Sequence, residues 1–168
     1  MTALAHYQAL LAAGGGVYLG YDPANKGANA ILENGNFDLY TGGGGSNKWA
    51  LSQTKKNSGK WRVQFVHVTQ TDTMGGGFAL NNTLGGYVGS NNNGAALFGN
   101  YGGYMRLYRN ASYAQFTGGI ASGGLVDLYL DLDAGMAWWA RNGTILAGNP
   151  GAGTGAMQTW TPGADVWI

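Results

Sequence analysis

The acidic side chains that lie closest together in the sequence are Asp127, Asp131 and Asp133. Every second residue of a β-strand projects to the same face, so a strand here would carry all three carboxylates on one face. Carboxylate oxygens can coordinate Ca²⁺, but a calcium site needs about six or more oxygen ligands. The alternative, which we favour, is that Asp133 caps the turn that follows it. We therefore expect no metal ion.

Side chains arranged for catalysis are not evident either. Hydrolysis of a glycosidic bond needs two carboxyl groups that flank it, one of them held protonated. The chain has one glutamate, Glu33, beside Asn34 and Gly35 in a predicted turn. Of the two histidines, His67 is expected on the inward face of a strand and His6 in a short helix. We predict no catalytic residues, and a glycoside hydrolase is kept as an alternative.

Charged side chains are scarce: 9 are basic and 8 acidic among 168 residues, or 10% against a usual value of about 25%. The densest basic group, at Lys55 and Lys56 with Lys60 and Arg62 nearby, is too small to neutralise nucleic-acid phosphates. No nucleic-acid partner is therefore expected. A surface of low charge repels copies of itself only weakly, which suits a protein packed in an assembly.

Neither a cofactor nor a membrane span is predicted. The glycine runs 14–16 and 42–45 are not followed by the Lys-Ser/Thr pair of a phosphate-binding loop. The longest apolar stretch, residues 9–21, is too short to span a bilayer and is interrupted by glycines.

The elements that would position these residues fall into two parts. Residues 2–13 are the helical candidate, with Thr2 as N-cap and Gly14 as the stop. A helix of this length is marginal alone, so residues 1–16 are interpreted as an anchor or oligomerisation arm, or as a helix that packs on its own domain. In residues 17–168, glycine and asparagine clusters separate short aromatic and aliphatic runs, which is typical of an all-β domain.

In two segments of this domain the side chains alternate between two faces with a period of two, the pattern of a half-buried strand. Their inward faces are expected to carry Trp61, Val63, Phe65 and His67 in the first segment, and Val126, Leu128, Leu130 and Leu132 in the second. Asn142 and Gly143 are typical of a tight type I′ hairpin turn. Residues 125–146 are therefore predicted to form an antiparallel meander.

Aromatic side chains on outward strand faces are the candidate ligand-binding residues. Alternation in the predicted strand that begins at Tyr104 turns Met105 and Leu107 to one side, and Tyr104, Arg106 and Tyr108 to the other. Rings beside polar groups suit sugars, whose C–H faces stack on rings while their hydroxyls need donors and acceptors. The alternative is that the rings only form cross-strand pairs, each worth about 0.2 to 1 kcal/mol.

A second stripe of candidate ligand residues is Tyr129 with Trp138. If Trp139 points inward, Trp138 turns outward toward Tyr129. The run 91–93, together with Tyr101, is either a recognition loop or a turn-rich connection.

The segment 125–156 resembles the SPRY-like, concanavalin A-like sandwich domains of bacteriophage virion and tail proteins. Its sequence is LVDLYLDLDAGMAWWARNGTILAGNPGAGTGA. In that family a D-L-D-x-G turn, an aromatic strand and an N-G hairpin follow one another, often before a G-N-P-x-x-G-T loop. Upstream runs extend the similarity to residues 21–156: YDPANKGANAILENGNFDLY, SGKWRVQFVHV and YVGSNNNGAALFGNYGGYMRLY.

The resemblance implies an all-β fold, a two-sheet antiparallel β-sandwich (jelly roll), to which we add the short N-terminal helix. It also implies a protein on the virion surface, while the expectation that this protein is non-enzymatic rests on the residue content described above. Its expected partners are other virion proteins, copies of itself and host surface polysaccharide. Many copies make weak sites useful, because linked sites raise overall affinity by about 10² to 10⁴. The alternative is a structural decoration or cement protein whose aromatic residues face protein neighbours.

The C-terminal residues depart from the family pattern. Its members usually continue beyond the G-T loop into a further strand, whereas this sequence ends at Ile168 after MQTWTPGADVWI. Either residues 165–168 form a shortened version of that strand, or a neighbouring molecule covers the edge. An uncovered apolar edge would pair with other chains.

Overall fold

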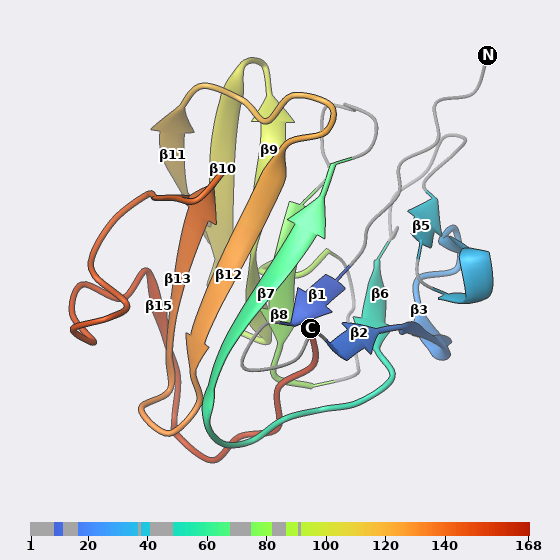
Figure 1. Ribbon diagram of the computed structural model, residues 1–168, viewed down its shortest axis with the longest axis horizontal. Coiled ribbons are helices and arrows are strands. Elements are labelled where there is room, and N and C mark those ends of the chain that lie inside the picture. The colour runs from blue at the N-terminus through green and yellow to red at the C-terminus, as the bar shows by residue number, and fades with distance from the viewer. Residues whose placement is uncertain are drawn as a thin grey trace.

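The computed structural model describes residues 9–11, 17–36, 38–40, 49–67, 75–81, 87–90 and 92–168. These residues form β-strands joined by turns, with one short 3-10 helix, η1 (Asn34–Asn36), among them. The described part of the chain holds no helix long and apolar enough to cross a lipid bilayer. The strands in Figure 1 are β1 (Ala9–Leu11), β2 (Val17–Leu19), β3 (Tyr21–Lys26), β4 (Ile31–Glu33), β5 (Asp38–Tyr40), β6 (Ala50–Ser52), β7 (Lys60–Val66), β8 (Gly75–Ala79), β9 (Gly94–Tyr101), β10 (Tyr104–Arg109), β11 (Ser112–Thr117), β12 (Leu125–Asp131), β13 (Met136–Arg141), β14 (Thr144–Ile145) and β15 (Gln158–Thr159).

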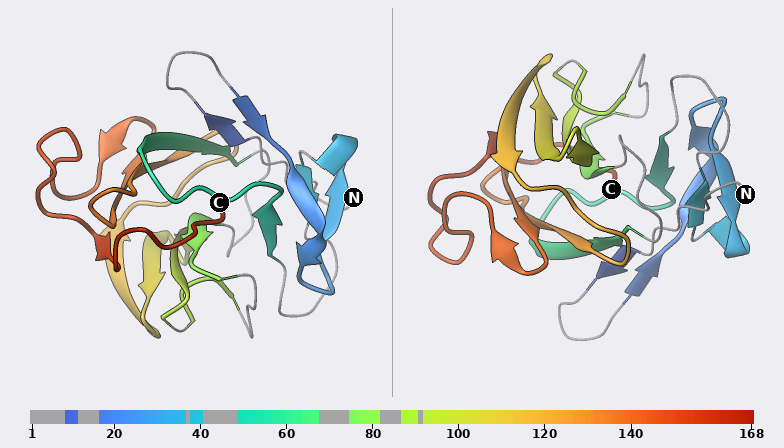
Figure 2. Two further views of the ribbon diagram at one scale, coloured as in Figure 1. Left: turned by 90° about the horizontal axis from the view of Figure 1, so that it is seen from below. Right: turned by 90° about the horizontal axis from the view of Figure 1, so that it is seen from above.

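Two sheets form the body of the molecule. The larger sheet has 7 strands in the order β14-β13-β12-β7-β1-β2, with β15 also paired to β13. The smaller sheet has 4 strands in the order β11-β10-β9-β8. The pairs between these strands are antiparallel. Figure 2 shows the two sheets as separate layers, with β3 and β5 to one side. The predicted all-β sandwich is confirmed.

The core lies between the sheets, on the strand faces that alternation predicted. Val63 and Phe65 of β7 and Leu128 of β12 are buried from the larger sheet, and Leu97 and Leu107 from the smaller one. Burying a side chain of this size contributes about 1.5 to 3 kcal/mol relative to leaving it in water. Burial of these alternating faces therefore holds the two sheets together.

Trp139 of β13 links the two sheets. Its ring stacks on Phe78 of β8 with ring centroids 6.0 Å apart, and its Nε1 donates a hydrogen bond of 3.2 Å to the carbonyl oxygen of Gly76. A side chain at Gly76 would collide with the ring of Phe65, so glycine lets β8 approach this closely. Trp139 therefore points inward, which is the condition under which Trp138 was expected to turn outward.

The predicted meander is also present, with β12 paired to β13 and β13 to β14. Asn142 and Gly143 form the turn before β14 with φ angles of 49° and 80°. A type I′ turn requires this left-handed backbone at both central positions, and Asn-Gly is the pair that adopts it most readily. The side-chain oxygen of Asn142 also accepts a hydrogen bond of 2.7 Å from the amide of Leu125, which ties the turn to the start of β12.

The predicted N-terminal helix is wrong for Ala9–Leu11, which form strand β1. This strand pairs with β2 and with β7, where Leu11 lies opposite Val63. Pairing satisfies backbone groups that an open edge of β7 would leave exposed, whereas a short isolated helix is marginal. Residues 1–8 and 12–16 lie outside the described residues, so the anchoring arm stays a prediction there.

The last residues of the chain cover one edge of the sandwich themselves. Trp167 bridges Ala79 at the end of β8, and Val166 bridges the segment that precedes β7. The amide of Ser52 donates a hydrogen bond of 2.7 Å to the carbonyl oxygen of Ile168. Residues 165–168 thus serve as the shortened closing segment, through isolated bridges rather than a full strand.

Candidate functional site

Strand β10 presents the outward residues that the sequence predicted. Met105 and Leu107 are fully buried, while Tyr104 is 43% exposed. Because β10 lies between β9 and β11, its outward side chains have neighbours on both sides. The outward side chains of β10, their neighbours on β9 and β11, and Tyr87 from the loop before β9 together form what we call the aromatic face: Tyr87, Phe98, Tyr104, Arg106, Tyr108 and Tyr113.

Tyr108 is the centre of the aromatic face. Its ring centroid lies 5.2 Å from those of Tyr87 and Phe98, with interplanar angles of 79° and 85°. The ring of Tyr113, directly opposite on β11, is 5.4 Å away. Edge-to-face ring pairs of this kind contribute about 0.5 to 1.5 kcal/mol each. These neighbours half-bury Tyr108, so its ring mainly packs against the other rings of the face and offers less area to a ligand than they do.

The outer rings of the face remain accessible to solvent. Tyr87 is 46% exposed and Tyr113 is 50% exposed, similar to Tyr104. In the described part of the chain, the exposed large hydrophobic side chains are these three tyrosines and Ile31. Exposed apolar groups that gather on one face mark interaction sites, whereas scattered ones need no explanation.

Arg106 adds a charge to the aromatic face. Its guanidinium carbon lies 4.6 Å from the ring centroid of Tyr113, and its Nε donates a hydrogen bond of 3.3 Å to Oε1 of Gln115. Stacking on a ring and bonding to an amide restrict the side chain in one orientation. The face therefore offers rings and an oriented donor side by side.

The second predicted stripe does not form. Trp138 is 1% exposed, so the prediction that it turns out to solvent is wrong. Its Nε1 donates a hydrogen bond of 3.0 Å to the carbonyl oxygen of Thr154, in the loop that follows β14. This loop covers the ring. Tyr129 is half-buried, with the guanidinium carbon of Arg62 5.5 Å from its ring centroid.

Asp127, on the same side of β12 as Tyr129, is fully buried. Its carboxylate accepts hydrogen bonds from Nη2 of Arg62 at 2.8 Å, from Nε2 of Gln64 at 2.7 Å and from the amide of Gly143 at 3.2 Å. Burial alone would lower the pKa of Arg62, but hydrogen bonding and attraction to Asp127 outweigh it and raise that pKa. Asp127 is therefore a structural anchor on the outward side of the larger sheet.

The other two aspartates of the predicted carboxylate group are also engaged with the protein. Asp131, not Asp133, caps the turn after β12, by accepting a hydrogen bond of 3.0 Å from the amide of Ala134. It also pairs with Nζ of Lys60 at 3.0 Å. Asp133 accepts a bond of 2.9 Å from the amide of Gly59. Burial would raise the pKa of Asp131, but its interactions with Lys60 and the amide of Ala134 outweigh burial and lower that pKa. The described residues contain no group of three or more potential metal ligands.

His67 is buried, as its position on the inward face predicted. Burial lowers its pKa from 6.5 to about 4, so it is neutral at physiological pH. His6 lies outside the described residues. Glu33 ends β4, immediately before η1.

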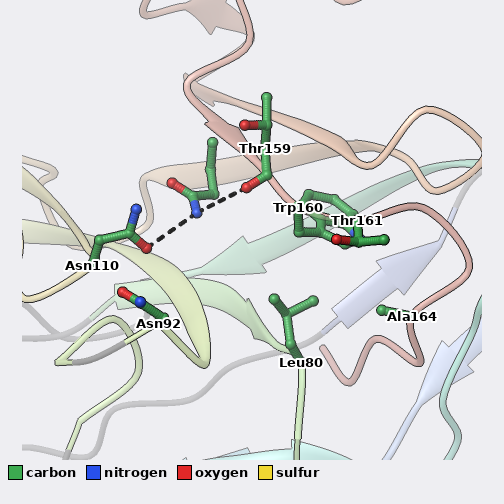
Figure 3. A pocket seen from close by; sticks show the side chains of 8 residues that line it. Leu80, Asn92, Asn110, Thr159, Trp160, Thr161 and Ala164 are labelled. Atoms are coloured by element: carbon green, nitrogen blue, oxygen red, sulfur yellow. Dashed lines mark hydrogen bonds between the residues drawn. The ribbon is translucent and has the colours of Figure 1, made fainter.

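A pocket that the sequence did not predict lies at one end of the sandwich (Figure 3). Its volume is about 440 Å³. Three of its side chains are amides, and we call it the amide pocket. It is lined by Leu80, Asn92, Asn110, Gln158, Thr159, Trp160, Thr161 and Ala164. The predicted recognition loop contributes Asn92, while the remaining lining comes from segments far apart in the sequence.

Comparison with known proteins defines the class of fold. No protein-family model matches the chain, and no curated protein is significantly similar to it in sequence. Its fold is that of SPRY-like β-sandwiches. The SPRY domain of human HERC1 has a TM-score of 0.68 at 20% identity, covering 88% of this chain and 86% of that one. The PSpry domain of TRIM65 has a TM-score of 0.60 at 14% identity, covering 89% and 81%.

Stonustoxin contains a similar unit within a much longer chain. Its TM-score is 0.58 at 16% identity, and the match covers 89% of this chain but 24% of stonustoxin. Identities this low show a shared fold alone, because one fold carries many functions. The SPRY-like part of the predicted resemblance is confirmed, and the phage virion setting remains a prediction.

Proposed function

We propose that this protein is a non-catalytic recognition module that binds surface glycans through the aromatic face, displayed in many copies on a virion. The supporting observation is the gathering of Tyr87, Tyr104 and Tyr113, exposed by 46%, 43% and 50%, around the oriented guanidinium of Arg106. Tyrosine rings stack on the C–H faces of sugars, and the guanidinium donates to hydroxyl oxygens. The virion setting is supported by the sequence resemblance and the low charge.

Multiple copies are part of the proposal because one such face would bind weakly. A dissociation constant near 1 mM corresponds to about 4 kcal/mol, which holds a ligand only briefly. Linked sites that engage together raise overall affinity by about 10² to 10⁴ without new contacts.

A glycan array probed with densely displayed protein tests the proposal. We expect binding to at least one glycan, reduced about tenfold or more by Tyr113→Ala and by Tyr104→Ala. Ile31→Ala is the matched control, because Ile31 is 48% exposed but is not part of the aromatic face. Absence of glycan binding by the displayed protein would contradict the proposal.

A protein-docking role, such as that of a cement module, is the second candidate. It is favoured by the pairing of Arg106 with Tyr113, since arginine and tyrosine are the residue types enriched at the centres of protein interfaces. In that case the tyrosine variants weaken incorporation into the particle, and the displayed protein binds no glycan on the array.

A further inference from the structure

We propose that the amide pocket binds one uncharged sugar ring, as a second subsite for the same glycan that the aromatic face engages. This inference rests on the proposed glycan-binding function. The volume of about 440 Å³ lies within the range of about 300 to 1,000 Å³ that is usual for small-molecule sites. The lining residues drawn as sticks in Figure 3 come from the end of β8, the loop before β9, the β10–β11 turn and the C-terminal segment.

The amides of this pocket have hydrogen-bonding capacity to spare. Nε2 of Gln158 donates to Oδ1 of Asn110 at 3.4 Å and to the carbonyl oxygen of Thr159 at 3.2 Å. Among the described residues, the side-chain amide of Asn92 and Nδ2 of Asn110 have no hydrogen-bond partner. An amide both donates and accepts, and a sugar hydroxyl does the same, so the two pair in either direction.

Trp160 forms the apolar wall of the pocket with Leu80 and Ala164. Its ring packs on Phe78 of the core with centroids 4.7 Å apart, which fixes its position. Because its Nε1 is buried, the ring contributes carbon atoms to the pocket wall. An apolar wall opposite amides matches the two sides of a pyranose ring, one of C–H groups and one of hydroxyls.

The lining excludes charged ligands as the preferred class. None of the lining side chains carries a charge. A carboxylate or phosphate entering the pocket would lose hydration and gain no ion pair, which costs free energy. Neutral hexoses and N-acetylhexosamines fit this chemistry, and uronic and sialic acids do not.

The pocket lies beside the aromatic face. Asn110 directly follows β10, which carries Tyr108, and the amide of the next residue, Ala111, donates a hydrogen bond of 3.3 Å to the carbonyl oxygen of Gly89. Gly89 belongs to the loop that carries Tyr87. One loop therefore contributes to the face and borders the turn that lines the pocket, so a glycan of several rings can contact both.

Nuclear magnetic resonance titration of the ¹⁵N-labelled full chain tests this inference. The probes are methyl glycosides of glucose, galactose and N-acetylglucosamine, with methyl glucuronide and N-acetylasparagine amide for comparison. We expect at least one neutral glycoside to shift the side-chain amide signals of Asn92, Asn110 and Gln158 at millimolar concentration. Asn92→Ala and Thr161→Ala should each weaken this binding about 3- to 10-fold. Asn57→Ala, at an exposed asparagine elsewhere, should leave it unchanged.

Several outcomes overturn the inference: no pocket shift with any neutral glycoside, an equal response to the glucuronide, or a response to the asparagine amide alone, which assigns the pocket to peptides. The Tyr113→Ala variant separates the two proposals. If the pocket shifts persist in this variant and the displayed wild-type protein binds no glycan on the array, the pocket binds sugar and the proposed role of the aromatic face fails. If array binding depends on Tyr113 and the pocket signals stay still, the reverse is true.

Discussion

Arg106 stacks on Tyr113 as a diagonal neighbour across β10 and β11, with its guanidinium carbon 4.6 Å from the centre of the ring. Arg106 lies directly opposite Gln115, and Tyr113 lies opposite Tyr108. Two interactions thus hold the arginine in place before any ligand arrives. A side chain ordered in advance loses less conformational entropy on binding, so this pair is the part of the aromatic face best prepared for recognition.

The stack can be tested by Arg106→Lys. Lysine keeps the charge but cannot stack as a plane or reproduce the geometry of the bond to Gln115. We expect the free energy of unfolding to change by less than about 1 kcal/mol, since the contact is exposed, while glycan or partner affinity falls several-fold. Urea unfolding and biolayer interferometry measure the two quantities. Arg109→Lys, on the same strand but outside the aromatic face, is the control; equal losses in both variants would argue against a special role for the stack.

Trp138→Ala should be a stability variant and not a ligand-binding variant. The ring is 1% exposed, and replacing a buried tryptophan by alanine costs about 3 to 5 kcal/mol. Tyr104→Ala, at a ring exposed to solvent, should cost less than about 1 kcal/mol. Urea unfolding of both variants gives the comparison. A cost for Trp138→Ala as small as that for Tyr104→Ala would show that the loop does not cover the ring in solution.

Asp127→Ala should strongly destabilise the fold. It removes the acceptor for Arg62, Gln64 and the amide of Gly143, and donors left without a partner cost about 1 to 3 kcal/mol. The Arg62 side chain is 39% exposed, so water solvates its charge and limits the loss from the broken ion pair. The double variant Arg62→Ala/Asp127→Ala should cost less than the sum of the single variants, because it leaves neither Arg62 nor the buried Asp127 without its partner. Additive costs in this cycle would contradict a coupled pair.

His67 should make stability depend on pH. Burial lowers its pKa from 6.5 to about 4, so between these values the unfolded chain binds a proton that the folded chain does not. The contribution of neutral His67 to the free energy of unfolding is therefore complete above about pH 6.5. It declines as the pH falls toward about 4, by up to about 3 kcal/mol.

Urea unfolding across this range measures the decline. His67→Gln should flatten it, and His6→Gln should leave it in place. A decline of the same size in the His67→Gln variant would assign it to other groups, such as Asp131, whose lowered pKa places its own effect below its ordinary value of 3.8.

Much of the fold follows from local pattern. The inward faces of β7, β10 and β12 could be predicted from the sequence, because every second residue of a strand lies on the same face, whatever packs against it. The Asn142-Gly143 turn was equally readable, since its backbone angles suit few other residue pairs. The outward position of Tyr104, Arg106 and Tyr108 followed from the same alternation.

Alternation does not say what covers the outward side of a strand. Trp138 and Asp127 have the outward positions that the pattern assigned to them, yet the loop at Thr154 and the side chain of Arg62 bury them. The amide pocket likewise joins Asn92, Asn110 and Gln158, which no local pattern connects. The residue types and their alternation determined a β-sandwich with an aromatic face, because each strand's faces depend on its own sequence. Which outward residues stay in solvent was decided by the tertiary structure, because burial depends on contacts between segments distant in the chain.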